Sequence, residues 1–135
     1  MEQKNNSREL PSVLALAYLG DAAHSLYVRR MLIERGLTKS GDLNSEALNY
    51  VTAEAQAEML LKIESLLTEE ELGVFKRAMN SKHLNKPRKR SGKDYRAATG
   101  FEAVIGLAEW KNDKERLLFL LDKSHKEDIE NDTEN

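Results

Sequence analysis

Apolar side chains recur along the chain at intervals of three and four residues, whereas strict alternation of apolar and polar positions is rare. Intervals of three and four place side chains on one face of an α-helix, and alternation places them on one face of a strand. The pattern therefore predicts an all-α fold, a bundle of five or six helices without a sheet.

The two longest predicted helices lie in the first half of the chain. The first spans residues 12–35, and Gly36 suits the left-handed conformation that often ends a helix. The second is expected to begin at about residue 44 and to run to residue 67, with Asp42 or Asn44 as its N-cap.

Three shorter helices are predicted in the second half. Thr68 and Glu71 have the spacing of a capping box, and Asn112 is the expected cap of the last helix. Pro87 and many cations indicate a loop between the first and the second of these helices. The expected ranges are 68–80, 95–110 and 113–125 for the helices and 81–94 for the basic loop.

Composition sets outer limits on the class of protein. The 135 residues suit one domain, and the absence of cysteine excludes a disulfide scaffold, a thiolate zinc site and a cysteine nucleophile. We expect a polar N-terminal segment at 1–11, one folded domain at 12–125 and an acidic flexible tail at 126–135. No apolar run approaches the ~20 residues that cross a bilayer, and the polar start lacks a signal-peptide core. The simplest expectation is a cytoplasmic protein without a membrane partner.

Two carboxylates interrupt helices that are otherwise apolar. Asp21 is the only formally charged residue in 11–28, and Glu102 is the only one in 97–108. A helix that is apolar on nearly all sides is expected to be buried on nearly all sides. A buried carboxylate needs a cation, a set of donors or a metal ion.

Glycines accompany both acids. Gly20 precedes Asp21, and Gly100 and Gly106 flank Glu102. Glycine inside a helix often permits close helix packing, so two helices crossing at these glycines would bring the acids together. Two carboxylates sharing a site repel each other unless one is protonated or a cation lies between them. Mg²⁺ is the natural cation because it prefers oxygen ligands.

An alternative to the metal site is that each acid forms a structural ion pair. Asp21 could pair with Arg29 or Lys76, and Glu102 could pair with Arg96. A single buried acid is more often such an ion-pair partner than a metal ligand. The residues alone leave the two interpretations about equally supported.

Other common catalytic patterns are absent from the sequence. The histidines His24, His83 and His125 lack metal-ligand spacing, and no phosphate-binding glycine loop or Gly-x-Ser-x-Gly elbow occurs. His24 follows Asp21 by three residues on the same helical face and could support the acid site from outside, but a packed histidine on the helix surface is the simpler expectation.

A basic segment lies between the two acidic helices. Residues 76–96 hold nine cations and one acid, which gives this segment a charge of +8 and the rest of the chain −10. Dense Lys and Arg without interleaved aromatic residues favour the backbone of a nucleic-acid duplex. A solvated loop or an acidic protein partner are the alternatives. The expected RNA-contacting residues are Lys82, Arg88, Lys89, Arg90, Lys93 and Arg96.

The acidic helices resemble those of a known family. Residues 16–22, LAYLGDA, resemble the signature helix of ribonuclease III, and residues 101–106, FEAVIG, resemble its second acidic helix. Residues 41–43, GDL, followed by a helix, are also similar. The resemblance covers about residues 12–122 and is closest to the mini-ribonuclease III subgroup, which has the catalytic domain alone and no double-stranded-RNA-binding domain.

The resemblance implies a homodimeric endoribonuclease that uses Mg²⁺ to cleave double-stranded RNA. Asp21 and Glu102 match the catalytic, metal-binding acids, and the products would carry 5′-phosphate and 3′-hydroxyl ends. For the subgroup it implies maturation of both ends of the 23S ribosomal RNA precursor. A ribosomal protein bound to that RNA is a candidate partner, because binding through the basic loop alone should be weak.

The sequence also departs from the family pattern. Three positions where larger relatives carry further acids hold Leu14, Ala17 and Thr99. This loss favours one alternative, a catalytically reduced ribonuclease III-like protein that binds RNA or assists ribosome assembly. A second alternative is a helical protein-interaction module whose basic loop binds acidic partners. Glu54, Glu58 and Asp94 are candidate substitute ligands.

Overall fold

A computed structural model describes residues 9–81 and 92–126, and within these ranges every regular element is helical. The predicted all-α class is therefore confirmed. The elements are α2 (Val13–Glu34), α3 (Ser40–Val51), α4 (Ala53–Ile63), the short 3₁₀ helix η1 (Glu64–Leu66), α5 (Glu69–Met79), α6 (Gly92–Trp110) and α7 (Lys114–Ser124).

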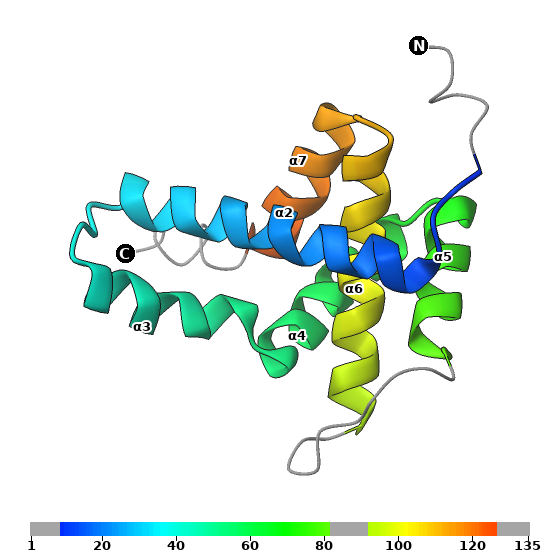
Figure 1. Cartoon of the computed structure of the whole chain (residues 1–135), viewed down its shortest axis with the longest axis horizontal. Helices are drawn as coiled ribbons and strands as arrows, with labels where there is room; N and C mark the ends of the chain where they lie inside the picture. Colours follow the sequence, from blue (N-terminus) through cyan, green and yellow to red (C-terminus); the bar gives the residue numbers. More distant parts are fainter. Residues whose placement is uncertain (1–8, 82–91, 127–135) are drawn as a thin grey trace.

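Helix α6 is the central element of the fold. Helix α2 crosses it on one side, and α4, α5 and α7 pack around its remaining surface (Figure 1). The main core cluster contains Phe101, Val104 and Ile105 of α6 together with Ile63 and Leu121 of the surrounding helices. Burial of these side chains is the principal stabilising term, at about 1.5–3 kcal/mol for each large apolar side chain.

The expectation of burial on nearly all sides holds for α6 and is wrong for α2. Residues 98–101 and 103–108 of α6 are buried without a gap except at Glu102. The outer side of α2, by contrast, leaves Tyr18 84%, Leu26 62% and Ile33 57% exposed. Apolar composition does not reveal which side of a helix its own chain covers, and only one side of α2 packs on α6.

Helix boundaries differ from the prediction in the middle of the chain. One helix was expected over residues 44–67, but the structure has two helices that meet at Thr52, whose ψ of 161° interrupts the first of them. The Thr52 hydroxyl accepts a hydrogen bond from the backbone nitrogen of Ala55 and caps α4. Neither Asp42 nor Asn44 is the N-cap of α3, because that helix begins earlier, at Ser40.

Two further boundaries were also placed wrongly. Helix α6 begins at Gly92 instead of residue 95. Asn112 does not cap α7, because its φ of 57° places it in the left-handed region. Asp113 is the N-cap and accepts a hydrogen bond from the backbone nitrogen of Arg116.

Other local signals are confirmed. Gly36 has a φ of 101° directly after α2, where a side chain would be strained. Thr68 and Glu71 form the predicted capping box, each side chain accepting a hydrogen bond from the backbone nitrogen of the other residue at 3.2 and 2.9 Å. No helix in the described ranges combines the length and the apolar character that crossing a membrane requires.

Candidate active site

Two glycines let α2 and α6 cross with their backbones in contact. A Cβ atom on Gly20 would lie 2.8 Å from the backbone nitrogen of Gly106 and closer still to the carbonyl oxygen of Glu102. A Cβ atom on Gly106 would lie 3.0 Å from the backbone nitrogen of Gly20. The predicted close packing is confirmed for this pair. Gly100 has another role, because it leaves room for the Phe75 ring of α5.

The crossing brings Asp21 and Glu102 together, as the sequence predicts. Their side chains lie within hydrogen-bonding reach of each other. Burial, and after it the Asp21 carboxyl, raises the pKa of Glu102 to about 8, although a hydrogen bond from Gln56 opposes this rise. Two carboxyl groups this close ionise together only at a cost, so the pair retains a proton or accepts a cation in its place.

The two acids differ in their access to solvent. Asp21 is exposed beside the open side of α2, whereas Glu102 is partly buried. The expectation of a buried Asp21 is therefore wrong, for the same reason as the expectation of a buried α2. One partly buried and one exposed carboxylate form a site that is open to solvent on the Asp21 side.

Structural ion pairs do not explain these acids in the described part of the chain. Neither Asp21 nor Glu102 pairs there with a Lys or Arg side chain. The Arg96 guanidinium, one proposed partner, donates from Nη1 to the carbonyl oxygen of Met79 at 2.9 Å and so ties α6 to the end of α5. The metal-binding interpretation gains support from this result.

A third residue of the site, Gln56, was missed by the sequence analysis. Its amide Nε2 donates to Glu102 Oε2 at 3.3 Å, and its side chain is buried between α4 and α6. The sequence did contain a signal for this residue, because Gln56 interrupts the apolar stripe of α4 that contains Met59, Leu60 and Ile63. A polar side chain in such a stripe needs a buried partner.

Two of the three positions that departed from the family pattern are packed into the core. Ala17 joins a cluster with Val74 and Leu107, and Thr99 donates its hydroxyl to the carbonyl oxygen of Tyr95 at 2.9 Å. Leu14 is half-buried. None of the candidate substitutes, Glu54, Glu58 and Asp94, completes a group of three or more His, Cys, Asp or Glu side chains that could hold a metal, within the residues described.

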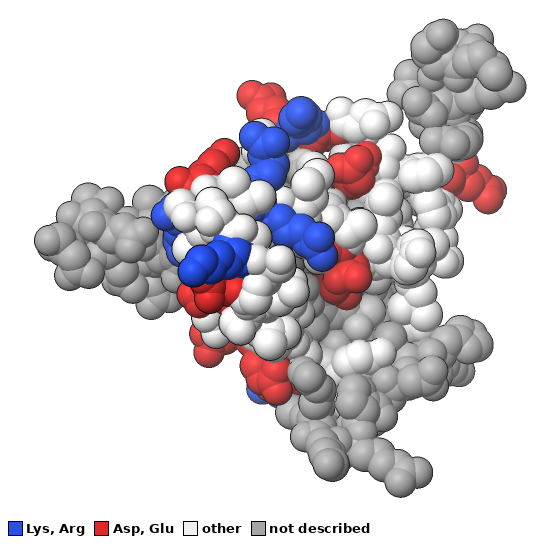
Figure 2. Space-filling model, turned by 60° about the vertical axis from the view of Figure 1, so that its left-hand side comes forward, with Lys and Arg blue, Asp and Glu red and all other residues white. Residues whose placement is uncertain are grey.

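Only part of the predicted RNA-contacting set can be placed. Lys93 is exposed in the first turn of α6, and Arg96 follows it one turn later, half-buried. Lys82, Arg88, Lys89 and Arg90 lie outside the described residues, as does most of the basic loop. Figure 2 shows that, on the face toward the α2–α3 end, positive and negative side chains are interspersed around a broad uncharged area.

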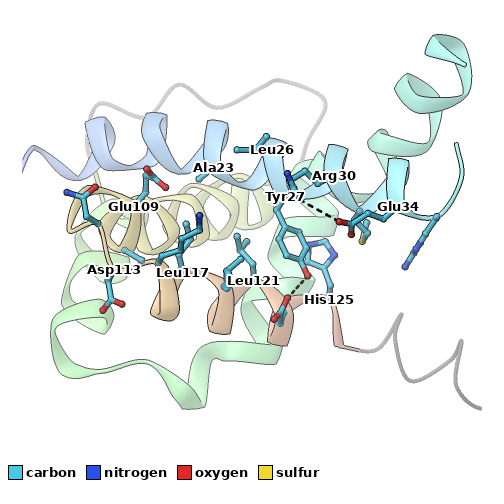
Figure 3. A pocket seen from close by; sticks show the side chains of 17 residues that line it. Ala23, Leu26, Tyr27, Arg30, Glu34, Glu109, Asp113, Leu117, Leu121 and His125 are labelled. Atoms are coloured by element: carbon cyan, nitrogen blue, oxygen red, sulfur yellow. Dashed lines mark hydrogen bonds and ion pairs between the residues drawn. The ribbon is translucent and has the colours of Figure 1, made fainter. Parts of the chain in front are cut away.

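A large groove lies apart from the two acids. It has a volume of about 1140 Å³ and runs between α2 and α7, where Leu26, Tyr27 and Leu117 are among the lining residues (Figure 3). Neither Asp21 nor Glu102 lines it. The groove is therefore not the site of the paired carboxylates.

Comparison with known proteins gives consistent matches. Residues 14–110 match the family model of the Ribonuclease III domain. A protein of Streptococcus pneumoniae named Mini-ribonuclease 3 is 43% identical over 77% of this chain and 83% of its own length. Its namesake in Brevibacillus brevis is 42% identical over 86% of this chain and 87% of its own length. A crystal structure of a Fusobacterium nucleatum protein superposes with a TM-score of 0.77 at 32% identity, covering 87% of this chain and 93% of that one.

Proposed function

Because this chain belongs to the ribonuclease III family, and within it to the mini-ribonuclease 3 proteins, we propose that it is a Mg²⁺-dependent endoribonuclease that cleaves double-stranded RNA. The observation that carries the proposal is the meeting of Asp21 and Glu102 at the backbone contact of α2 and α6. The substrate within this class is a stem of the 23S ribosomal RNA precursor, whose two ends the enzyme matures.

The residues present fit a divalent metal ion. Asp21 and Glu102 supply hard oxygen donors, and no cation in the described part of the chain neutralises them. Burial and the Asp21 carboxyl raise the pKa of Glu102 to about 8, which indicates that the pair needs a positive charge. Mg²⁺ is usually held by one or two carboxylates and several waters, so two acids suffice. When bound, Mg²⁺ supplies an activated water and charge stabilisation at the scissile phosphate.

The chain itself contributes orientation and charge. Gly20 and Gly106 fix the distance between the helices that carry the acids, and Gln56 holds one carboxylate oxygen of Glu102. Lys93, exposed at the start of α6, is suited to a phosphate of the duplex backbone. Cleavage then leaves 5′-phosphate and 3′-hydroxyl ends.

A homodimer would cover the open side of α2. Exposed Tyr18, Ala22, Leu26 and Ile33 lie at spacings that place them on one face of this helix, next to Asp21. Apolar side chains this exposed along one stripe are typical of a contact surface. A second copy related by a two-fold axis would set two sites across one duplex, one for each strand. A ribosomal protein bound to the RNA would add the selectivity that a single basic segment lacks.

A cleavage assay tests the function directly. The substrates are a stem that closes a 23S-type precursor and a single-stranded control of the same composition, at low salt with Mg²⁺ or with EDTA. We expect cuts confined to the duplex, dependent on Mg²⁺ and abolished by Asp21→Asn, which keeps the size and removes the charge. Glu115→Gln, which removes an exposed charge on α7, is the matched control and should cleave normally.

The same assay separates the rival function. Duplex binding without cleavage under every metal condition would overturn the catalytic proposal. The chain would then be an RNA-binding protein of the same fold, and Ala17 and Thr99 would mark a site that has lost its activity. Heparin competing as well as the duplex would instead indicate a protein-interaction module with general affinity for polyanions.

A further inference from the structure

A line of buried polar side chains runs from Glu102 into the interior of the protein. Its members are Gln56 of α4, His24 of α2 and His125 at the C-cap of α7, with 2%, 0% and 1% of their surface exposed. Gln56 Nε2 lies 3.3 Å from Glu102 Oε2 and 3.2 Å from His24 Nδ1. The Nε2 atoms of the two histidines lie 3.2 Å apart. Three helices therefore contribute to one hydrogen-bonded line that ends at a candidate metal ligand.

When Glu102 is ionised, as it must be to bind a metal ion, the donors and acceptors along this line have one consistent arrangement. The amide nitrogen of Gln56 carries two N–H groups, one for Glu102 and one for His24 Nδ1. His24 must then carry its proton on Nε2 and donate it to Nε2 of His125. An amide turned the other way would set its oxygen against the Glu102 carboxylate, acceptor against acceptor. With its proton on Nε2, His24 accepts the second N–H of the amide and so supports the orientation that serves the acid.

The surroundings keep the histidines neutral and fixed. Burial, and after it the neighbouring His125, lowers the pKa of His24 to about 3, so the ring stays neutral and keeps one nitrogen as an acceptor. The Phe101 ring meets the His24 ring edge-on at 5.3 Å between centroids. The rings of Tyr27 and Tyr50 lie 4.9 and 5.5 Å from that of His125, and Tyr27 in turn donates to Asp122 at 2.8 Å (Figure 3). Packing of this kind restricts the rotation of both imidazoles.

We propose that Gln56, oriented by the His24–His125 pair, is a positioning residue that holds Glu102 ready to bind the metal ion. The proposal rests on the proposed function, because it deepens the role of the same site. A glutamate side chain has three rotatable bonds, and fixing one of its oxygens before binding reduces the entropy lost when a metal orders it. Outer partners of metal ligands of this kind typically change metal affinity by about 10- to 100-fold.

The contrasting explanation is that Gln56 only satisfies buried polar groups. In that case its loss would lower stability and leave metal binding as it was. The test therefore measures binding of Mn²⁺ to the full chain by electron paramagnetic resonance, separately from cleavage. Thermal melting of every variant is recorded alongside.

The informative variants are Gln56→Met, which keeps the length of the side chain and removes the amide, and His24→Phe, which keeps an aromatic ring and removes both ring nitrogens, the acceptor for Gln56 and the donor to His125. Glu71→Gln is the matched control, because it weakens a buried contact to Arg116 far from the acids. We expect about 10- to 100-fold weaker Mn²⁺ binding for Gln56→Met, a smaller loss for His24→Phe and none for Glu71→Gln.

Each outcome has a defined meaning. Mn²⁺ affinity of Gln56→Met within twofold of the wild type would overturn the positioning role and leave the proposed function standing. A wild-type chain that bound no Mn²⁺ would instead overturn the proposed function. Long-range ¹H–¹⁵N spectra of the histidines give a readout that needs no metal and holds even if Gln56→Met fails to fold. A proton on Nδ1 of His24 would contradict the proposed orientation.

Discussion

Replacing Glu102 with glutamine is expected to stabilise the metal-free protein, although it should abolish activity. The change keeps the shape of the side chain, and the new amide can donate to Asp21 and accept from Gln56. It removes a carboxylate that burial and Asp21 disfavour in its charged form. Groups that serve a metal in this way commonly reduce the stability of the empty protein.

The sign of the pH dependence follows from the shifted pKa. Below pH 4.5 Glu102 is protonated in both the folded and the unfolded chain, so it makes no difference to stability. Between pH 4.5 and about 8 the unfolded chain releases this proton while the folded chain retains it, and stability falls as the pH rises. Above about pH 8 the full cost is present. The glutamine variant does not titrate and avoids it.

The magnitude follows from the same values. A rise of the pKa from 4.5 to about 8 corresponds to roughly 5 kcal/mol at full effect. Water on the exposed side and movement of the Asp21 side chain relieve part of this cost, so we expect about 1–3 kcal/mol at pH 9. For a chain of this size that is a rise in Tm of about 4–12 °C.

Thermal melts followed by circular dichroism, at fixed protein concentration from pH 4.5 to 9, measure the difference. Added Mg²⁺ should raise the Tm of the wild type and leave that of Glu102→Gln unchanged. Glu71→Gln is the control with the opposite sign. Burial opposes ionisation of Glu71, but hydrogen bonds from Arg116 and Thr68 hold its pKa below the usual value. Its variant should be less stable from pH 4.5 to 9, and the difference should vanish in melts extended into acid below pH 4.5.

Two results would refute the reasoning. Glu102→Gln could be less stable than the wild type at pH 9, which would mean that the carboxylate is well accommodated when charged. Alternatively, the difference between the two proteins could stay constant from pH 5 to pH 9. That result would show that any gain arises from packing and not from a shifted pKa.

Four further predictions concern the fold and its surfaces. Gly20→Ala should prevent native folding, because its Cβ would collide with the α6 backbone. Gly41→Ala, which has open space around its Cβ, should raise stability by up to ~1 kcal/mol. Circular dichroism melts measure both variants, and equal melting temperatures would contradict the close crossing of α2 and α6. Tyr18→Asp should convert a dimer into folded monomers in sedimentation velocity, and an unchanged dimer would exclude this face of α2 as the interface. Thr68→Ala should cost about 1 kcal/mol in urea denaturation through loss of the capping box, and an unchanged midpoint would remove that role. Lys93→Gln should reduce the slope of log affinity against log salt for a duplex by about one, while an identical slope would mean that Lys93 contacts no phosphate.

Much of the site could be predicted because its signals are local. A single charge in an otherwise apolar helix marks Asp21 and Glu102 without knowledge of their neighbours, and the glycines nearby indicate a close crossing. Gln56 differs because its importance depends on a partner 46 residues further along the chain. Its position in an apolar stripe was visible, but that position does not reveal which group it contacts.

The errors in the fold have a related origin. The break at Thr52 depends on a backbone conformation that packing selects, since threonine is also tolerated inside helices. The open side of α2 has the apolar composition of a buried side. The sequence therefore does not tell whether this chain or another molecule covers it. His24, expected at the helix surface, is fully buried because α4 and α7 close over it.

The backbone contact between Gly20 and Gly106 has a consequence for how this enzyme can evolve. In most proteins, substitutions of core side chains during evolution slowly change the separation of helices, and distances in the active site change with it. Here no side chain lies between the two helices at the crossing, so such substitutions cannot change their separation at this point. The separation of the two acids is therefore insulated from neutral change elsewhere. New metal preferences or substrates would have to arise through the loops or the residues around the acids.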